Sequence, residues 1–110
     1  YLRIYEAARG DFLHKVGMPF SKMAAELNIV CPVVNAEINY HKPAVLDEEI
    51  TVKTSIISLR GARLVFVQQI FNADDVLLND IKVTVAFVDM EKRKPVKYPY
   101  EFDKVLDIKD

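Results

Sequence analysis

The sequence contains little cysteine, and this excludes whole classes of site. Cys31 is the single cysteine among 110 residues, so neither a disulfide framework nor a cysteine-ligated metal site is available. A lone cysteine can act as a nucleophile. Cys31, however, stands in the apolar run IVCPVV at the start of a strand pattern, and this setting favours a buried structural thiol.

Glycine and histidine are also scarce. The three glycines stand alone at positions 10, 17 and 61, so the sequence has no glycine-rich loop of the kind that holds phosphates. The two histidines, His14 and His41, fall in different predicted elements. They do not make a metal site together, and we interpret each as structural rather than catalytic. No metal-binding site is therefore expected.

An excess of charge of one sign and long apolar runs are missing as well. The net charge is −1, so no overall basic field indicates a nucleic-acid partner. No apolar run approaches the length of a membrane span. Hydrophobic residues make up 51% of the chain, which is ample for a core. A chain of this length is predicted to form one domain over residues 1–110.

Residues 1–16 form the only long helical pattern. Tyr1, Tyr5, Ala8, Phe12 and Val16 recur at intervals of three or four, which places them on one arc of a helix. Further apolar residues widen this arc: Leu2, Ile4 and Leu13. A helix this apolar is expected to be covered on most sides. Backbone N–H groups at its N-terminus favour a negative charge or a developing oxyanion.

Alternating patterns dominate the rest of the chain, after a short predicted helix at 22–27 that Ser21 can cap and Asn28 can end. The alternation predicts four strands, at residues 30–41, 49–59, 62–72 and 77–89. Tight turns are predicted at Gly61 and at residues 72–75. Short turns imply antiparallel neighbours, and strands of about ten residues imply a curled sheet. The sequence therefore predicts an α+β architecture, with a curled antiparallel sheet around one long central helix.

The last predicted strand indicates which positions face the core. One set is apolar and is expected to point inward: Ile81, Val83, Val85 and Phe87. A second set is polar and is expected to be more solvated: Asn79, Lys82 and Thr84.

Basic residues gather at two places. Arg60 and Arg63 flank the predicted hairpin tip, and a loop at residues 91–97 carries the second group: Lys92, Arg93, Lys94 and Lys97. Solvated surface charge is the ordinary explanation of both groups. The alternative is a phosphate-rich ligand lying across this surface, because Arg and Lys side chains both bind phosphates.

Three stretches resemble those of a known family. They are YLRIYEAARGDFL in the helix, SLRGARLVF around the hairpin tip and FNADDVLLN at the next turn. They resemble hotdog-fold acyl-CoA thioesterases of the 4-hydroxybenzoyl-CoA thioesterase family, and within it the bacterial branch often encoded beside the Tol–Pal cell-envelope system. The resemblance covers nearly the whole chain and weakens after Pro99.

The resemblance implies a hotdog fold, in which one further strand usually precedes the helix. That strand and its loop carry the family signature, which is an aspartate, a glycine-containing turn and a His-x-x-Tyr motif. Tyr1 matches the tyrosine that closes this motif, and the other signature residues would lie before it. We therefore expect an N-terminally truncated hotdog domain without its first strand.

The implied reaction is hydrolysis of an acyl-CoA thioester to free CoA and a carboxylic acid. The upstream aspartate attacks the thioester or activates water. The carbonyl oxygen faces the helix N-terminus at Tyr1 and Leu2, where N–H groups stabilise the oxyanion. Glu6 and Arg9 match usual helix positions and are interpreted as structural, paired across a turn. The implied CoA-binding residues are Arg60, Gly61, Arg63 and Lys94. No cofactor is implied.

Two rival functions stay open. A hotdog dehydratase would need a histidine and an acidic residue on opposite subunits, and the sequence offers no convincing pair. The second rival is a non-catalytic protein that binds acyl-CoA or an envelope partner. The resemblance implies a cytoplasmic homo-oligomer, either a dimer or a tetramer, with active sites between subunits. The strand at residues 33–38 has few edge-protecting charges apart from Glu37, which agrees with pairing to a second copy.

Overall fold

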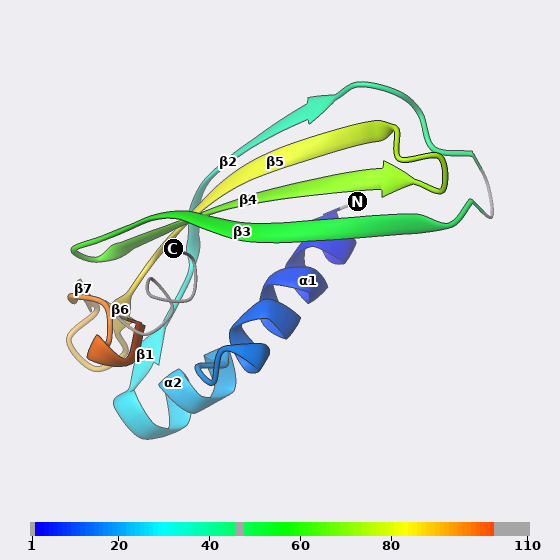
Figure 1. The fold of residues 1–110 in the computed structure, drawn as a ribbon. Coiled ribbons are helices and arrows are strands. Elements are labelled where there is room, and N and C mark those ends of the chain that lie inside the picture. The colour runs from blue at the N-terminus through cyan, green and yellow to red at the C-terminus, as the bar shows by residue number, and fades with distance from the viewer. Residues whose placement is uncertain (1, 46–47, 103–110) are drawn as a thin grey trace.

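The computed structural model describes residues 2–45 and 48–102. A long helix packs across one face of a four-stranded antiparallel sheet, and a second helix and a small three-stranded sheet lie at one end (Figure 1). This is the predicted α+β architecture. Tyr1, to which a role at the helix N-terminus was assigned, lies outside the described residues.

The long helix, α1, spans Leu2–Lys15. Its buried residues are Tyr5, Arg9 and Leu13, spaced four apart along one narrow face. The expectation that the helix is covered on most sides is wrong for the described residues, because the sheet covers one face only. Leu2 is 64% exposed and Ile4 38% exposed on the other side.

The second helix, α2, spans Phe20–Leu27 and begins two residues earlier than predicted. Pro19 occupies the N-cap position, and its carbonyl accepts hydrogen bonds from the backbone N–H groups of Lys22 and Met23. Ser21 therefore lies inside the helix and does not cap it. The predicted end is confirmed, because Asn28 adopts a left-handed conformation with φ 58°.

The main sheet has the order β2-β5-β4-β3, with every neighbouring pair antiparallel. Its strands are β2 (Val33–Tyr40), β3 (Ile50–Arg60), β4 (Arg63–Asn72) and β5 (Leu77–Ala86). The small sheet, in the order β1-β6-β7, contains β1 (Ile29–Val30), β6 (Val88–Asp89) and β7 (Lys94–Pro95). A short 3-10 helix, η1, follows at Tyr100–Phe102.

Two predicted strands are each divided between these two sheets. The strand predicted at residues 30–41 breaks at Pro32, which has no backbone N–H to donate to a ladder. The strand predicted at 77–89 breaks at Phe87, whose N–H donates to the carbonyl of Ala62 in the hairpin turn instead of to a strand partner. A third difference lies at residues 91–97, which were predicted to form a basic loop but contain the short strand β7.

Both predicted turns are confirmed. Gly61 has φ 58° at the tip of the β3–β4 hairpin, a conformation that glycine adopts without steric cost. At the β4–β5 turn, the side-chain Oδ1 of Asn72 accepts hydrogen bonds from the N–H groups of Asp74 and Val76, as asparagine does in turns. The two turns set the register of the three long neighbouring strands.

The core lies between α1 and the two central strands. Completely buried side chains on β4 and β5 include Leu64, Phe66, Ile70, Ile81, Val83 and Val85. Phe66 meets Phe12 of α1 edge to face, with ring centroids 6.3 Å apart. Phe87 and Phe102 form a second edge contact, with centroids 5.4 Å apart. The inward positions predicted for the last strand are confirmed by their burial.

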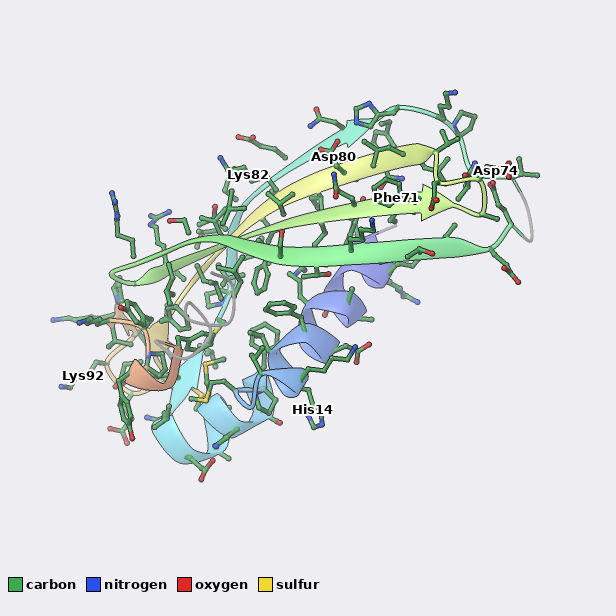
Figure 2. The ribbon with its side chains drawn as sticks, viewed as in Figure 1. His14, Phe71, Asp74, Asp80, Lys82 and Lys92 are labelled. Atoms are coloured by element: carbon green, nitrogen blue, oxygen red, sulfur yellow. The ribbon has the colours of Figure 1, made fainter. Side chains whose placement is uncertain are left out.

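A polar cluster joins β2 to β5 at one end of the sheet. His41 Nε2 lies 2.6 Å from Asp80 Oδ2, and Asn39 Nδ2 donates to Asp80 Oδ1 over 3.0 Å. Figure 2 shows Asp80 and Lys82 on the sheet face that turns away from α1. His14 is exposed on the solvent side of α1. Neither histidine belongs to a group of three or more metal-ligating side chains within the described residues.

Replacing Phe66 with alanine is expected to lower the free energy of unfolding by about 3–5 kcal/mol. The reason is that this ring is completely buried and fills the centre of the core. Urea denaturation at a fixed protein concentration measures the change. Phe71→Ala on the same strand is the matched control, because its ring is only half-buried beneath Lys53 Nζ at 4.8 Å. Equal losses in the two variants would contradict this assignment of the core.

Acid is expected to remove the stabilisation that Asp80 provides. Hydrogen bonds from Asn39 and then His41 hold the pKa of Asp80 below its ordinary value. A depressed folded-state pKa stabilises the fold above the unfolded-state pKa of about 3.9, and this contribution is lost as the pH falls through the folded-state value. The stability difference between wild type and Asp80→Asn should therefore shrink as the pH falls below about 4.

Thermal unfolding of both proteins across this pH range measures the effect, with the exposed turn residue variant Asp74→Asn as the control. A stability difference that stays constant with pH would show that the Asp80 charge is not what Asn39 and His41 stabilise.

Candidate functional site

A buried polar contact lies beneath the first turns of α1. The hydroxyl of Tyr5 donates to Oδ1 of Asn79 on β5, and both residues are completely buried. The expectation that Asn79 is solvated is wrong. Alternation places residue 79 on the same face as Ile81 and Val83, so the period of two would have predicted its burial despite its polarity. The Nδ2 group of Asn79 has no hydrogen-bond partner among the described residues.

A second buried network holds α1 one turn further along. Gln68 of β4 is completely buried. Its Nε2 donates to the backbone carbonyl of Tyr5 over 2.8 Å and to Thr54 Oγ1 over 3.1 Å. Its Oε1 accepts from Arg9 Nη1 over 2.8 Å. Gln68 therefore connects the helix to both β4 and β3 and fixes the direction of the Arg9 side chain.

Glu6 and Arg9, which were predicted to pair across a helical turn, do not form an ion pair in the described part of the chain. The guanidinium of Arg9 donates to Gln68 instead. Burial of Arg9, which is 8% exposed, lowers its pKa from the ordinary value, while the charge of Glu6 acts in the opposite direction. Arg9 is thus a desolvated cation on the inner face of α1.

A cavity of about 660 Å³ opens beside this network, between α1, α2 and β1. Its wall is mostly apolar and includes Phe20, Ala24 and Ile29, while Glu6 and Arg9 supply charged groups from α1. Small-molecule sites in proteins have volumes of about 300–1,000 Å³ and combine apolar walls with a few polar groups. Sequence reasoning missed this cavity, because the residues around it come from four segments that only the fold brings together.

Cys31 forms part of the same wall and is half-buried. Its Sγ lies 3.9 Å from Met23 Sδ. Burial raises the pKa of the thiol to about 12, so the thiolate that a nucleophile requires is scarce near neutral pH. The structural interpretation of Cys31 agrees with this environment.

The predicted CoA-binding residues gather at the far end of the sheet. Arg60 and Arg63 face each other across the β3–β4 hairpin tip, and both are exposed. The carbonyl of Gly61 accepts a hydrogen bond from the N–H of Tyr98 over 2.9 Å, so the tip contacts the segment after β7. Lys94 lies on β7 and is exposed. Figures 1 and 2 show the tip, β7 and Lys92 at this same end of the molecule.

The predicted oxyanion site lies elsewhere. Leu2 begins α1 and is 64% exposed, and the first turn contains no acidic residue that would occupy its N–H groups. This end of α1 and the hairpin tip lie well apart along the sheet (Figure 1). Within one chain, the two predicted parts of the site are therefore not brought together. No helix in the described ranges is long and apolar enough to cross a membrane.

The chain is similar to known acyl-CoA hydrolases. A sequence model described as the Thioesterase-like superfamily matches residues 1–106. The acyl-CoA thioester hydrolase YbgC of Escherichia coli O157:H7 is 37% identical over 99 residues, which is 90% of this chain and 73% of that protein. The acyl-CoA thioesterase YbgC of Haemophilus influenzae is 31% identical over 101 residues, covering 92% of this chain and 74% of that protein.

Solved structures agree with this family. A DHNA-CoA thioesterase from Staphylococcus aureus superposes with a TM-score of 0.86 at 25% identity, covering 99% of this chain and 77% of that one. A probable thioesterase from Bartonella henselae gives a TM-score of 0.80 at 32% identity, covering 90% and 81%. The helix laid across an antiparallel sheet, together with the match over residues 1–106, therefore shows that this chain belongs to the Thioesterase-like superfamily and has the hotdog fold.

Proposed function

We propose that this protein is an acyl-CoA thioester hydrolase, which releases free CoA and a carboxylic acid. The observation that carries the proposal is 37% identity to an acyl-CoA thioester hydrolase over 90% of this chain. The structure is compatible with that chemistry, since it combines a helix N-terminus, a mostly apolar cavity and exposed basic side chains. We further propose that the protein belongs to the 4-hydroxybenzoyl-CoA thioesterase family and, within it, to the Tol–Pal-associated branch.

The proposed oxyanion site is the start of α1. The first N–H groups of a helix lack partners within the helix and carry the positive end of its dipole. At Leu2 these groups lie near the surface, with no acidic side chain in the first turn to compete for them. Donors held in fixed positions stabilise the negative charge that develops on a thioester oxygen. The carboxylate that attacks or activates water is proposed to be an aspartate upstream of Tyr1.

The proposed CoA-binding surface consists of Arg60, Gly61, Arg63 and Lys94. The arginine side chains are exposed, and no ion pair occupies them among the described residues. Guanidinium groups bind phosphate oxygens through paired N–H donors, while lysine acts as a point charge. Binding of the CoA phosphates here leaves the thioester end free to extend toward an active site.

A homo-oligomer is proposed because one chain keeps the two parts of the site apart. The edge strand β2 presents apolar side chains to solvent, with Val33 51% and Val34 47% exposed. An exposed strand edge with such side chains favours pairing with another chain. Val33 also borders the cavity beside α1, so a second copy paired at β2 would adjoin that cavity. A dimer or tetramer is therefore proposed. A cytoplasmic location, which the family resemblance implies, is proposed separately.

The proposed reaction is tested by release of the free CoA thiol from a panel of acyl-CoAs. We expect thiol release, and we expect it to disappear when the aspartate proposed upstream of Tyr1 is changed to alanine. Tight CoA binding without release of thiol from any acyl-CoA would instead favour a non-catalytic acyl-CoA-binding protein.

The double variant Arg60→Ala/Arg63→Ala is expected to raise KM for acyl-CoA by about tenfold, which corresponds to about 1.4 kcal/mol of binding free energy. It should leave KM nearly unchanged for the matching acyl-pantetheine thioester, which lacks the nucleotide phosphates. Steady-state kinetics on both substrates measures the difference. Lys22→Ala on α2 is the control, because Lys22 is exposed on a separate element. Equal changes for both substrates would argue against phosphate binding at the hairpin tip.

A further inference from the structure

We propose that the cavity between α1, α2 and β1 binds the acyl group of the substrate, and that Arg9 selects acyl groups that carry an additional oxygen acceptor. Arg9 is then a specificity-determining residue as well as a member of the network that holds α1 on the sheet. The inference rests on the proposed hydrolase function and deepens it, because it names the class of acyl group.

The Arg9 side chain is buried and leaves most of its donors unused within the described chain. A guanidinium has five N–H donors, and Arg9 uses one of them in its single hydrogen bond within the described chain, from Nη1 to Gln68 Oε1. The residue is only 8% exposed. A buried charge costs free energy unless hydrogen bonds and an opposite charge compensate it. Because Arg9 also borders the cavity, an oxygen atom of an occupant is well placed to provide that compensation.

The Arg9 side chain is also held in place by Gln68. Gln68 accepts from Arg9 while donating to the Tyr5 carbonyl and to Thr54 Oγ1. This arrangement leaves Gln68 little freedom to rotate, so the guanidinium it holds is oriented before any ligand arrives. A polar group whose direction is fixed by its supporting hydrogen bonds gives specificity at a small entropic cost.

The rest of the cavity wall is mostly apolar. Phe20, Ala24 and Ile29 can contact only the apolar part of an occupant. Glu6 is exposed to solvent, so water screens its charge. The cavity therefore suits an acyl group with an apolar body and one acceptor oxygen. A purely hydrocarbon acyl group would displace water from the unused donors of Arg9 without offering them an acceptor.

The test compares three acyl-CoAs that share the carbon skeleton hydrolysed fastest by the wild-type protein: the unsubstituted form, the form with a terminal hydroxyl and the form with a terminal carboxylate. Arg9→Met is expected to lower the preference for the oxygenated forms, measured as a ratio of kcat/KM values, by at least about tenfold. Arg9→Lys should restore part of it, because lysine keeps the charge and the donors. The hydroxyl and carboxylate forms distinguish a neutral acceptor from an anion.

Arg3→Met is the matched control, because Arg3 is exposed on the same helix. Binding of the same three acyl-CoAs by calorimetry gives a second readout that does not require turnover. If the wild-type protein hydrolyses acyl-CoAs but Arg9→Met changes kcat/KM for all three acyl-CoAs by the same factor, the inference is overturned and the proposed function stands. If no acyl-CoA releases thiol, the proposed function fails, and the calorimetric ratios still decide whether Arg9 selects the oxygenated forms.

A second variant tests the cavity itself without touching Arg9. Ala24→Phe is expected to fill part of the space beside α2, so that kcat/KM for the largest acyl group accepted by the wild type falls by about tenfold or more, while the value for acetyl-CoA stays nearly unchanged. Circular dichroism confirms that the variant folds. Ala25→Phe, at the exposed neighbouring position of α2, is the control. Unchanged size selection in Ala24→Phe would show that the acyl group binds elsewhere.

Discussion

The arrangement of this protein depends on how α1 is fastened to the sheet. Apolar contacts hold the helix at Tyr5, Phe12 and Leu13, and hydrogen bonds to buried polar groups hold it at Tyr5 and Arg9. Gln68 is the central residue, since it joins Arg9, the Tyr5 carbonyl and Thr54. Hydrogen bonds are directional, so they fix the rotation and the position of α1 along the sheet more narrowly than apolar packing does. The placement of the helix N-terminus follows from them.

The same network gives the proposed substrate site its polarity. Burying Arg9 is unfavourable for folding by itself, and the network offsets only part of that cost through one hydrogen bond. Such local conflicts between stability and polarity are concentrated at functional sites. The buried charge of Arg9 borders an apolar cavity that is large enough for a ligand. The carboxylate of Asp80, in contrast, accepts hydrogen bonds from Asn39 and His41 and so joins two strands.

Prediction from the sequence succeeded where local chemistry decides. Gly61 and Asn72 determine their turns through conformations and side-chain hydrogen bonds that involve only near neighbours, and strand alternation gave the inward residues of β5. Prediction failed where distant segments decide. Asn79 was expected to be solvated because it is polar, yet Tyr5, far away in the chain, provides its partner. The strand predicted at residues 77–89 ends early because Phe87 meets the hairpin turn at Ala62.

The sequence by itself determined the class of fold, the order of the two helices and the four long strands, and the two hairpin turns, because periodicity and turn preferences are properties of neighbouring residues. The resemblance of its motifs led to the family. Only the tertiary structure decided that Arg9 faces inward, that Gln68 orients it and that a cavity opens at their side. These features require α1, β4 and α2 to meet in space, and the energy of a buried charge depends on that environment rather than on the residue type.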